Sequence, residues 1–555
     1  MIAGMGIDLV ELEGFRTQLA DTASTFLAGG FTQLELADAE GRPAMDKAPH
    51  LAGRYAAKEA FLKAWSSANC GRPQALPSVD LREIEVVTDA RGRPTLCLHG
   101  RVRDAVSQLE LAAMYGDARR VAEAEKLYWN ILEAQPDYAE ALHMLGLVAH
   151  QNRHHVAAAE IMQKGIALTP EDPGAHANLS DVLRCLGRFD EAVAAGQRAI
   201  ELRPDFANAH NNLGNVFKDV GRVDEAIAAY RRTLELIPDD PEARWNLSLL
   251  LLLHGDLERG WPLYEARWET EARRPSRRDF AQPMWDGRAL EGRTLLIHAE
   301  QGLGDSLQFI RYARQAAAAG GLVIVECQRS LARLFADVEG VSKVVASGDP
   351  LPSFDLHVPM LSLPLVFRTT LETIPGHAPY LAVSPGHGEA WRQWLGGDGP
   401  HLKVGLVWAG RATTFQQNMR ALRLEQLFPL LEMPGVEFVS LQVDKRGGEL
   451  LENPISSSIR DPRPRIADFA DTAALISQLD LVISIDTAVA HLAGALGKPT
   501  WVLLPFAADW RWLLGRSESP WYPATRLFRQ PRLMEWEPVI AGVREELQSL
   551  IQARA

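Results

Sequence analysis

The chain has little cysteine, and its cysteines lie far apart. Cys70, Cys97, Cys185 and Cys327 are spread over 555 residues, and none belongs to a Cys-x-x-Cys pair. Such spacing predicts neither a zinc site nor a framework of disulfides. Stability must therefore come from apolar cores, for which a hydrophobic content of 47% supplies ample material.

Long apolar runs and an excess of positive charge are also missing. The longest apolar run, around Leu249–Leu253, is far shorter than the roughly 20 residues that span a bilayer. No basic segment leads an apolar stretch at the first residues, so we expect no secretory signal and a cytoplasmic protein. The formal net charge of -13 argues against nucleic acid as a partner, because phosphate backbones bind basic surfaces.

The middle of the chain contains a repeat of 34 residues. Three residue types recur at this interval: Pro136, Pro170, Pro204 and Pro238; Ala124, Ala158, Ala192 and Ala226; Leu145, Leu179, Leu213 and Leu247. A helix–turn–helix unit explains the pattern, because small residues let two helices approach closely and proline ends the second helix. Each unit cannot bury its apolar face alone, so the units are expected to stack into a superhelix.

The repeat resembles the tetratricopeptide repeat over about residues 104–272. Asn212-Leu-Gly214, Tyr230 and Pro238 carry the resemblance, which implies a protein or peptide partner. Asn178, Asn212 and Asn246 form a further column with the same period. An amide both donates and accepts hydrogen bonds, which suits a peptide backbone, and a similar ladder lines the groove of O-linked N-acetylglucosamine transferases. The alternative is that these amides bond within the array, and the sequence leaves both open.

From about residue 280, short apolar runs alternate with helical stretches. The predicted strands cover 294–297, 322–325, 404–408, 438–441, 481–485 and 501–504. Strands that alternate with helices indicate parallel α/β sheets. A segment rich in Gly and Pro, about 376–402, separates two such sets. We therefore expect two lobes, 280–385 and 400–555, with a ligand crevice at the carboxyl ends of the strands.

Two motifs lie at the ends of predicted strands. Glu300-Gln-Gly302-Leu-Gly304-Asp305 follows the first strand, and its glycines permit a tight turn against a ligand. Taken alone, Asp305 is an ordinary helix N-cap. The second motif runs from Asp486-Thr487 through His491 to Pro499. It begins a helix whose free N–H groups and dipole suit a diphosphate, although a capped structural helix with a packed histidine is the alternative.

Together the two motifs resemble those of the heptosyltransferase-like glycosyltransferases of family nine, which have the GT-B fold. The resemblance spans about 290–535, and the closing segment Pro505–Trp512 is similar to that of bacterial proteins in which tetratricopeptide repeats precede such a domain. It implies transfer of a sugar from a nucleotide diphosphate to a hydroxyl, without a metal in this domain. Asp305 is the implied general base, and His491 is implied at the leaving group. The implied donor-binding residues are Gly302, Gly304, Asp486 and Thr487, with Arg411 and Arg420 as candidate cations.

Residues 1–103 resemble holo-acyl-carrier-protein synthase. The stretches 5–11, 31–35 and 51–65 carry the resemblance, and 81–86 with 92–98 is expected to form a hairpin. That family transfers 4'-phosphopantetheine from coenzyme A to a serine of acyl carrier protein. The resemblance implies Mg²⁺ held by Asp8 and Glu59, with Arg54, Lys58 and Lys63 at the coenzyme A phosphates. The alternative for these charged residues is a solvated helix face. The family's last strand is missing before the repeats begin, so the segment is expected to be incomplete.

The expected fold class is multidomain α/β plus α. It comprises an N-terminal α+β phosphopantetheinyl-transferase-like segment, α-superhelical tetratricopeptide repeats and a C-terminal GT-B two-lobed Rossmann-like α/β domain. Three functions follow: a glycosyltransferase guided by its repeats, a magnesium-dependent phosphopantetheinyl transferase, and a binding scaffold without catalysis. We favour the first, with a nucleotide-diphosphate sugar as donor and a protein held by the repeats as candidate acceptor.

Overall fold

The computed structural model describes most of the chain after residue 120. The described residues are 121–271, 273–376, 378–410, 420–443, 445–452 and 458–554, with 31, 35–36, 39, 58, 84–88 and 94–98 before them. The chain divides into two units, Met1–Val182 and Leu183–Ala555, and each is described by itself. Within the described residues, every helix is too short or too polar to cross a membrane.

The first unit contains a hairpin and the first repeats. Strands β1 (Ile84–Thr88) and β2 (Pro94–Leu98) pair antiparallel with Val86 opposite Leu96, as the sequence predicted. The repeat helices that follow are α7 (Val121–Ala134), α8 (Ala139–Gln151), α9 (His155–Leu168) and α10 (Pro173–Cys185), the last of which ends in the second unit.

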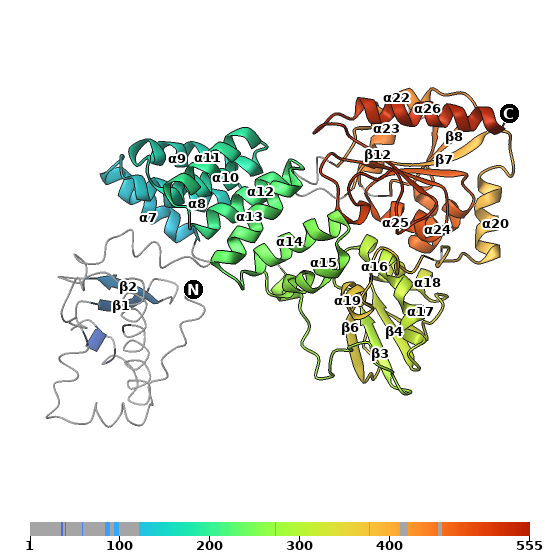
Figure 1. Ribbon diagram of the computed structural model, residues 1–555, viewed down its shortest axis with the longest axis horizontal. Coiled ribbons are helices and arrows are strands. Elements are labelled where there is room, and N and C mark those ends of the chain that lie inside the picture. The colour runs from blue at the N-terminus through green and yellow to red at the C-terminus, as the bar shows by residue number, and fades with distance from the viewer. Residues whose placement is uncertain are drawn as a thin grey trace. The chain divides into compact units, whose positions relative to one another are not determined.

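The second unit continues the repeats. Its helices are α11 (Phe189–Leu202), α12 (Ala207–Asp219), α13 (Val223–Leu236), α14 (Pro241–His254) and α15 (Leu257–Tyr264) (Figure 1). The structure confirms that close helix packing and helix-ending prolines underlie the 34-residue repeat. Ala192 and Ala226 have no exposed surface, and a Cβ added to Gly214 would lie 2.8 Å from the ring of Tyr230. Pro204 and Pro238 each stand just beyond the end of a helix, α11 and α13.

The first lobe is a parallel sheet of order β5-β4-β3-β6. Its strands are β3 (Thr294–His298), β4 (Leu322–Cys327), β5 (Lys343–Ala346) and β6 (Leu356–Pro359), and its helices are α16 (Leu303–Phe309), α17 (Ala313–Ala317), α18 (Arg329–Phe335) and α19 (Leu363–Val366). Leu295, Leu296 and Ile297 are buried on consecutive positions, as a parallel strand covered on both faces requires. The strand order reverses between β3 and β6, which makes the end of β3 a switch point.

The second lobe is a parallel sheet of order β12-β11-β10-β7-β8-β9. Its strands are β7 (Leu402–Val407), β8 (Val436–Ser440), β9 (Ile459–Arg460), β10 (Leu481–Ile485), β11 (Thr500–Leu504) and β12 (Thr525–Arg529). Its helices are α22 (Phe428–Leu431), α23 (Glu449–Glu452), α24 (Phe469–Ser477), α25 (Ala488–Ala495) and α26 (Glu537–Arg554), with α20 (Pro385–Trp394) leading into the lobe. Here the switch point lies between β10 and β7.

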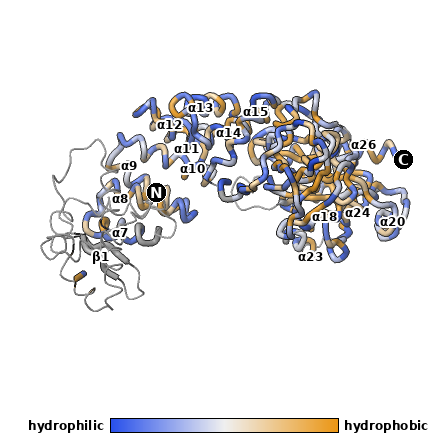
Figure 2. Tube along the Cα trace, turned by 90° about the horizontal axis from the view of Figure 1, so that it is seen from below, coloured by the Kyte–Doolittle hydropathy of each residue, from blue (hydrophilic) through white to orange (hydrophobic). Residues whose placement is uncertain are grey.

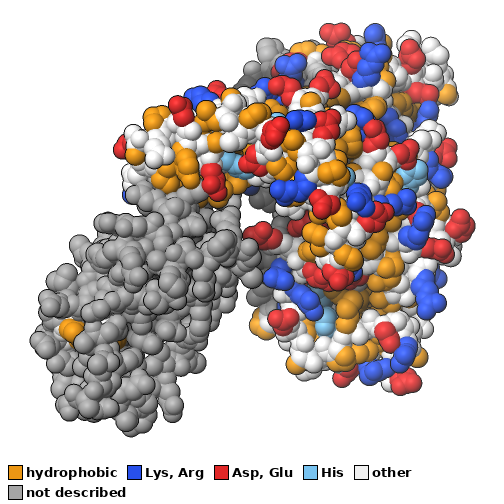
Figure 3. All heavy atoms as spheres, turned by 60° about the vertical axis from the view of Figure 1, so that its left-hand side comes forward, with side chains coloured by type: hydrophobic (Ala, Val, Ile, Leu, Met, Phe, Trp, Pro, Cys, Tyr) orange, Lys and Arg blue, Asp and Glu red, His pale blue; other side chains and the backbone are white. Residues whose placement is uncertain are grey.

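The last repeats and the two lobes share one apolar core. Trp261 on α15 donates its indole N–H to the carbonyl of Thr369 in the first lobe, at 3.0 Å. The same ring meets Trp510 of the second lobe edge-on, with centroids 5.4 Å apart. Hydrophobic positions are frequent along the trace of the two lobes (Figure 2), and charges of both signs are scattered over the face of the described residues in Figure 3. The end of the repeat array is therefore built into the two-lobed domain.

Candidate functional site

The two sequence motifs meet across one crevice between the lobes. A Cβ added to Gly304 would lie 2.9 Å from Cδ2 of His491 and 3.6 Å from Cα of Ala488. The crevice has a volume of about 860 Å³. The predicted site residues that line it are Gly302, Gly304, Asp305, Arg420, Asp486, Thr487 and His491. Arg411, the remaining predicted donor contact, lies outside the described residues.

Sheet topology explains why these turns meet. The first motif follows β3 and the second follows β10, and each strand stands beside the point where the order of its sheet reverses. Connections leave opposite faces of the sheet at such a point, which opens a cleft at the carboxyl ends of the strands. The crevice therefore lies where a doubly wound fold provides space for a ligand.

Both carboxylate oxygens of Asp305 are engaged. Oδ2 accepts the backbone N–H of Gly302 at 2.7 Å, three residues back, and so closes the first turn of α16. Oδ1 accepts from the guanidinium of Arg511, which comes from the other lobe. The sequence suggested Asp305 as the helix N-cap, but Gly302 holds that position, and Asp305 is the third residue of the helix. Asp305 still caps the helix through the Gly302 N–H, and the arginine is a further partner.

Arg511 is the main residue of the crevice that sequence reasoning missed. It lies on a short 3-10 helix, Trp510–Trp512, that follows β11, and its side chain is 9% exposed. Its Nη1 donates to Oδ1 of Asp509 at 2.8 Å, and its guanidinium lies 4.2 Å from the ring centre of Trp510. The segment from Asp509 to Trp512 was part of the family resemblance, but only the fold places it against Asp305.

Asp486 and His491 form the second wall. Oδ2 of Asp486 lies 3.4 Å from Nη1 of Arg420. Burial raises the pKa of Asp486 above its usual range, and the charge of Asp509 adds to the rise. Burial also lowers the pKa of His491 to about 3, so its imidazole is neutral near pH 7. It can donate one hydrogen bond to a ligand, but it carries no positive charge there.

The start of α25 is the anion-favouring element of this wall. Thr487 is its N-cap residue, and the Thr487 hydroxyl lies 3.1 Å from that of Ser484 rather than on the first-turn amides. First-turn N–H groups have no partner inside a helix and carry the positive end of its dipole. Among the described lining residues, three arginines face three aspartates: Arg273, Arg420 and Arg511 against Asp305, Asp486 and Asp509. An anionic ligand would therefore depend on these arginines and on the helix end.

The repeats supply part of the crevice themselves. Trp245 and Leu249 from α14 and Tyr264 from α15 line it. The hydroxyl of Tyr264 accepts from Nε2 of Gln301, which belongs to the first motif, at 3.1 Å. The Arg273 guanidinium lies 4.8 Å from the ring centre of Trp245. These repeat residues were not predicted, because nothing in the 34-residue period shows which repeat meets the lobes.

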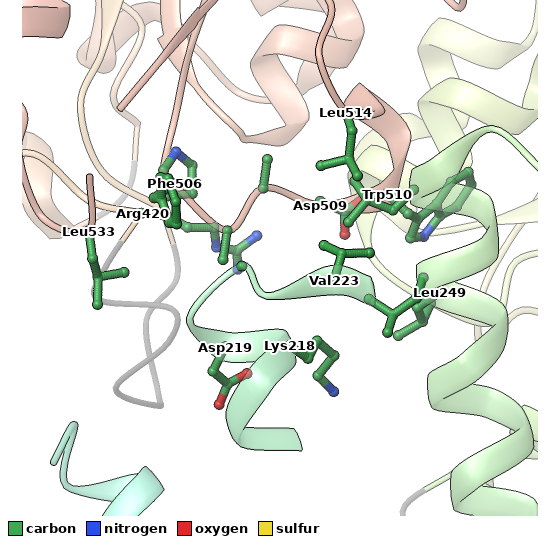
Figure 4. Close-up of a pocket in the computed structure, with 16 residues that line it drawn as sticks. Lys218, Asp219, Val223, Leu249, Arg420, Phe506, Asp509, Trp510, Leu514 and Leu533 are labelled. Atoms are coloured by element: carbon green, nitrogen blue, oxygen red, sulfur yellow. The ribbon is translucent and has the colours of Figure 1, made fainter. Parts of the chain in front are cut away.

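A smaller cavity of about 240 Å³ adjoins the crevice. It lies between α12, α13 and α14 of the repeats and residues 505–514 of the second lobe (Figure 4). It shares Leu249, Arg420, Asp509 and Trp510 with the crevice, and its other walls include the apolar Val223 and Phe506. The crevice thus has an apolar extension toward the repeats.

The asparagine column is partly engaged within the repeats. Nδ2 of Asn178 lies 2.8 Å from Nε2 of His143, and Oδ1 of Asn246 accepts from Nζ of Lys218 at 2.8 Å. Asn246 is buried, and Asn212 is half-buried on α12. The contacts of Asn178 and Asn246 agree with the alternative interpretation of the column, and peptide binding through it stays a prediction.

The N-terminal candidates lie mostly outside the described residues. Asp8, Glu59, Arg54 and Lys63 are not among them. Lys58 is described: its Nζ donates to Glu35 at 2.6 Å, and both side chains are fully buried. Its proposed contact with coenzyme A stays a prediction.

A buried charge network stands behind the first motif. Arg267, with no exposed surface, donates to Oε1 of Glu300 at 3.1 Å, to Oε1 of Glu265 at 2.6 Å and to the hydroxyl of Ser362 at 2.8 Å. Burial raises the pKa of Glu300 from 4.5 to about 7, despite the neighbouring Arg267. This network ties the segment after α15 to the start of the glycine turn.

Glu300→Gln is expected to reduce the loss of folding stability that accompanies a rise in pH. Because the pKa of Glu300 is raised, the folded state keeps a proton that the unfolded state loses between about pH 4.5 and 7. In the wild type, the retained proton adds on the order of 3 kcal/mol to the free energy of unfolding. This contribution is complete below pH 4.5 and disappears as the pH rises through 7. Gln keeps the neutral form, so the melting midpoint of the variant relative to wild type should rise from pH 5 to pH 8. An offset between the two melting midpoints that is the same at pH 5 and pH 8 would contradict the assignment.

Matches to known proteins cover all three parts of the chain. Residues 4–122 match the family model described as 4'-phosphopantetheinyl transferase superfamily. A holo-[acyl-carrier-protein] synthase of Mycolicibacterium smegmatis is 46% identical over 101 residues, which are 18% of this chain and 76% of the relative. A synthase of Mycobacterium sp. strain KMS is 41% identical over 129 residues, which are 22% of this chain and 98% of the relative. The chain belongs to the 4'-phosphopantetheinyl transferase superfamily.

This superfamily membership concerns the N-terminal part, and other families match beyond it. Tetratricopeptide-repeat models match 109–173, 180–221 and 207–240, and the model of glycosyltransferase family 9 (heptosyltransferase) matches 466–503. Both enzyme families are transferases. Protein FlbA of Caulobacter vibrioides is 29% identical over 318 residues, 53% of this chain and 53% of FlbA. The chain thus spans about half the length of FlbA.

Solved structures match the repeats. The crystal structure of MamA is 25% identical and covers 30% of this chain and 97% of its own, with a TM-score of 0.26. A thermophilic tetratricopeptide-repeat protein of Thermus thermophilus is 26% identical over 30% of this chain and 90% of its own, with a TM-score of 0.27. Scores this low support no inference about function.

Proposed function

We propose that the C-terminal domain transfers a sugar from a nucleotide-diphosphate donor to an acceptor hydroxyl. The observation that carries the proposal is the meeting of Gly304-Asp305 with Asp486–His491 in one crevice, at the switch points of two parallel sheets. The match of residues 466–503 to glycosyltransferase family 9 supports the same interpretation.

The crevice offers groups for both halves of the reaction. A hydroxyl is a poor nucleophile until a base takes its proton, and Asp305 is the proposed base. The departing nucleoside diphosphate needs its growing charge stabilised. Arg420, Thr487 and the N-terminus of α25 stand on the donor side for that task, and neutral His491 adds one hydrogen-bond donor. None of these steps requires a metal.

The acceptor is proposed to be a protein segment held by the repeats. Trp245, Leu249 and Tyr264 bring the repeat array into the wall of the crevice. The adjoining cavity with Val223 and Phe506 in its walls offers apolar surface for side chains of a polypeptide. A segment bound along the last repeats would thereby reach the donor.

A second activity, magnesium-dependent transfer of 4'-phosphopantetheine from coenzyme A to acyl carrier protein, is proposed for the N-terminal domain. The observation in its favour is 41% identity to a synthase over 98% of that synthase's length. Asp8 and Glu59 would hold Mg²⁺, and Arg54, Lys58 and Lys63 would face the phosphates. The two activities concern separate parts of the chain and do not exclude each other.

Ligand-induced stabilisation separates these functions. A ligand at one hundred times its dissociation constant stabilises the folded state by about 2.7 kcal/mol and raises the melting midpoint. Full-length protein would be screened against coenzyme A with Mg²⁺ and against a panel of nucleoside diphosphates and nucleotide sugars. We expect at least one nucleotide diphosphate to raise the midpoint. A response to coenzyme A alone would overturn the glycosyltransferase proposal, and no response to either would favour the scaffold.

A further inference from the structure

In this structure the proposed base is not free to act. Oδ2 of Asp305 accepts the Gly302 N–H, and Oδ1 accepts from Arg511. The Arg511 guanidinium occupies one lone pair of Oδ1. An acceptor hydroxyl that approaches Oδ1 therefore competes with Arg511 for that oxygen.

Arg511 is held in a way that permits such an exchange. Asp509 binds it twice, through Nη1 at 2.8 Å and through the backbone N–H at 3.0 Å. The ring of Trp510 supports the guanidinium at 4.2 Å. These contacts come from neighbouring residues of the same segment, whereas Asp305 comes from the opposite lobe and binds Nη2. Losing Asp305 would leave the guanidinium in place with Nη2 pointing into the crevice.

The natural replacement for Asp305 is the diphosphate of the donor. Arg511 lines the crevice together with Thr487, the N-cap of α25. A guanidinium binds phosphate oxygens in the same geometry as a carboxylate, and a diphosphate carries more charge than the carboxylate it would displace. Arg420, 3.4 Å from Asp486, lies on the same side of the crevice as a further cation for the diphosphate.

We propose that Arg511 exchanges Asp305 for the donor diphosphate and so releases Oδ1 of the base when the donor is bound. The inference rests on the proposed glycosyl transfer. In the transfer step, the acceptor oxygen forms a bond to the anomeric carbon while the bond from that carbon to the diphosphate oxygen breaks. The hydroxyl proton passes to Oδ1 of Asp305. The leaving nucleoside diphosphate keeps the bonding electron pair, and Arg511 stabilises its charge.

The test compares Arg511→Gln and Arg511→Lys with Arg333→Gln in the full-length protein. Arg333 is a matched control, because it also joins the lobes, to Asp468 at 2.6 and 2.9 Å, but lies on the exposed surface outside the crevice. Titration calorimetry would use the nucleoside diphosphate that stabilises wild type most, and the corresponding nucleoside monophosphate. The second readout is donor hydrolysis, separated into kcat and KM.

We expect Arg511→Gln to weaken diphosphate binding at least about tenfold, the usual effect of losing a charged hydrogen bond. Monophosphate affinity should stay within about threefold, since the exchange concerns the diphosphate. The kcat of donor hydrolysis should fall as well, because the leaving diphosphate loses the guanidinium that stabilises its charge. Arg511→Lys should fall between wild type and Arg511→Gln, and Arg333→Gln should match wild type in both readouts.

Two results would overturn the exchange. One is a diphosphate affinity that is unchanged in both Arg511 variants. The other is an equal loss of monophosphate and diphosphate affinity with an unchanged kcat, which indicates a structural role. If Arg511→Gln folds poorly, Arg511→Lys decides by the same criteria. Absence of nucleoside diphosphate binding in wild type would instead overturn the proposed function itself, so the two failures are distinguishable.

Discussion

Asp305→Asn is expected to reduce sugar transfer by roughly 10²–10⁴-fold, the usual contribution of a general base. Asn keeps an oxygen that can accept the Gly302 N–H, so the turn before α16 should persist. It loses the negative charge that would accept the hydroxyl proton. Nucleotide binding should therefore survive within a few-fold while turnover nearly vanishes. The measurement is product formation by mass spectrometry, beside calorimetric binding of the nucleoside diphosphate.

Asp349→Asn is the matched control for this change. Asp349 lies in the same lobe and also pairs with an arginine, Arg329, at 2.5 Å, but it is 46% exposed and lies outside the crevice. It should leave turnover at the wild-type level. Turnover by Asp305→Asn within about threefold of wild type would remove Asp305 from the role of base, because a lost general base costs far more than that.

Trp261→Ala is expected to destabilise the unit that holds the last repeats and the two lobes by about 3–5 kcal/mol. The side chain is 2% exposed, packs against Trp510 and donates to the Thr369 carbonyl, so alanine leaves a cavity and an unpaired carbonyl. Because Trp510 and Tyr264 line the crevice and both contact Trp261, donor binding should weaken as well. Thermal unfolding with and without nucleotide measures both effects.

Trp129→Ala is the matched control, because it removes the same type of side chain at an exposed position. Trp129 on α7 is 50% exposed, so its removal should change the melting midpoint little. If Trp261→Ala melts no more than about 2 °C below wild type, a shift well under that of a 3 kcal/mol loss, the repeats are not built into the two-lobed core.

The repeat pattern and the strongest strands could be read from the sequence. The residues that recur every 34 positions predict the repeats because helix packing there depends on residues close together in the sequence, such as Leu213, Leu247 and the small residues beside them. The strands β3, β4, β7, β8, β10 and β11 are buried apolar runs, and each was predicted. The strands β5, β6, β9 and β12 were not predicted. Lys343, His357 and Arg526 interrupt the apolar character of β5, β6 and β12, and β9 has only two residues.

The sequence predicted the two motifs of the site. It did not predict the residues that contact them from the other lobe or from the repeats. Gly304 and His491 belong to motifs whose spacing is local, and each lies in the helix that follows a strand. Arg511 bonds Asp305 across 206 positions of sequence, and Trp245 enters the crevice through the placement of a whole helix. Contacts of that kind depend on how the lobes and repeats pack, which no residue pattern along the chain records. The neutral state of His491 likewise follows from its burial against Trp512 and Tyr522.

The most direct test of the central claim is donor hydrolysis by the full-length protein, measured by mass spectrometry across a panel of nucleotide-diphosphate sugars. If the crevice between Gly304-Asp305 and Asp486–His491 is a donor site, at least one sugar nucleotide should be cleaved to free sugar and nucleoside diphosphate, and Asp305→Asn should stop the cleavage. A folded protein that leaves every donor in the panel intact, or whose cleavage persists in Asp305→Asn, would contradict the account.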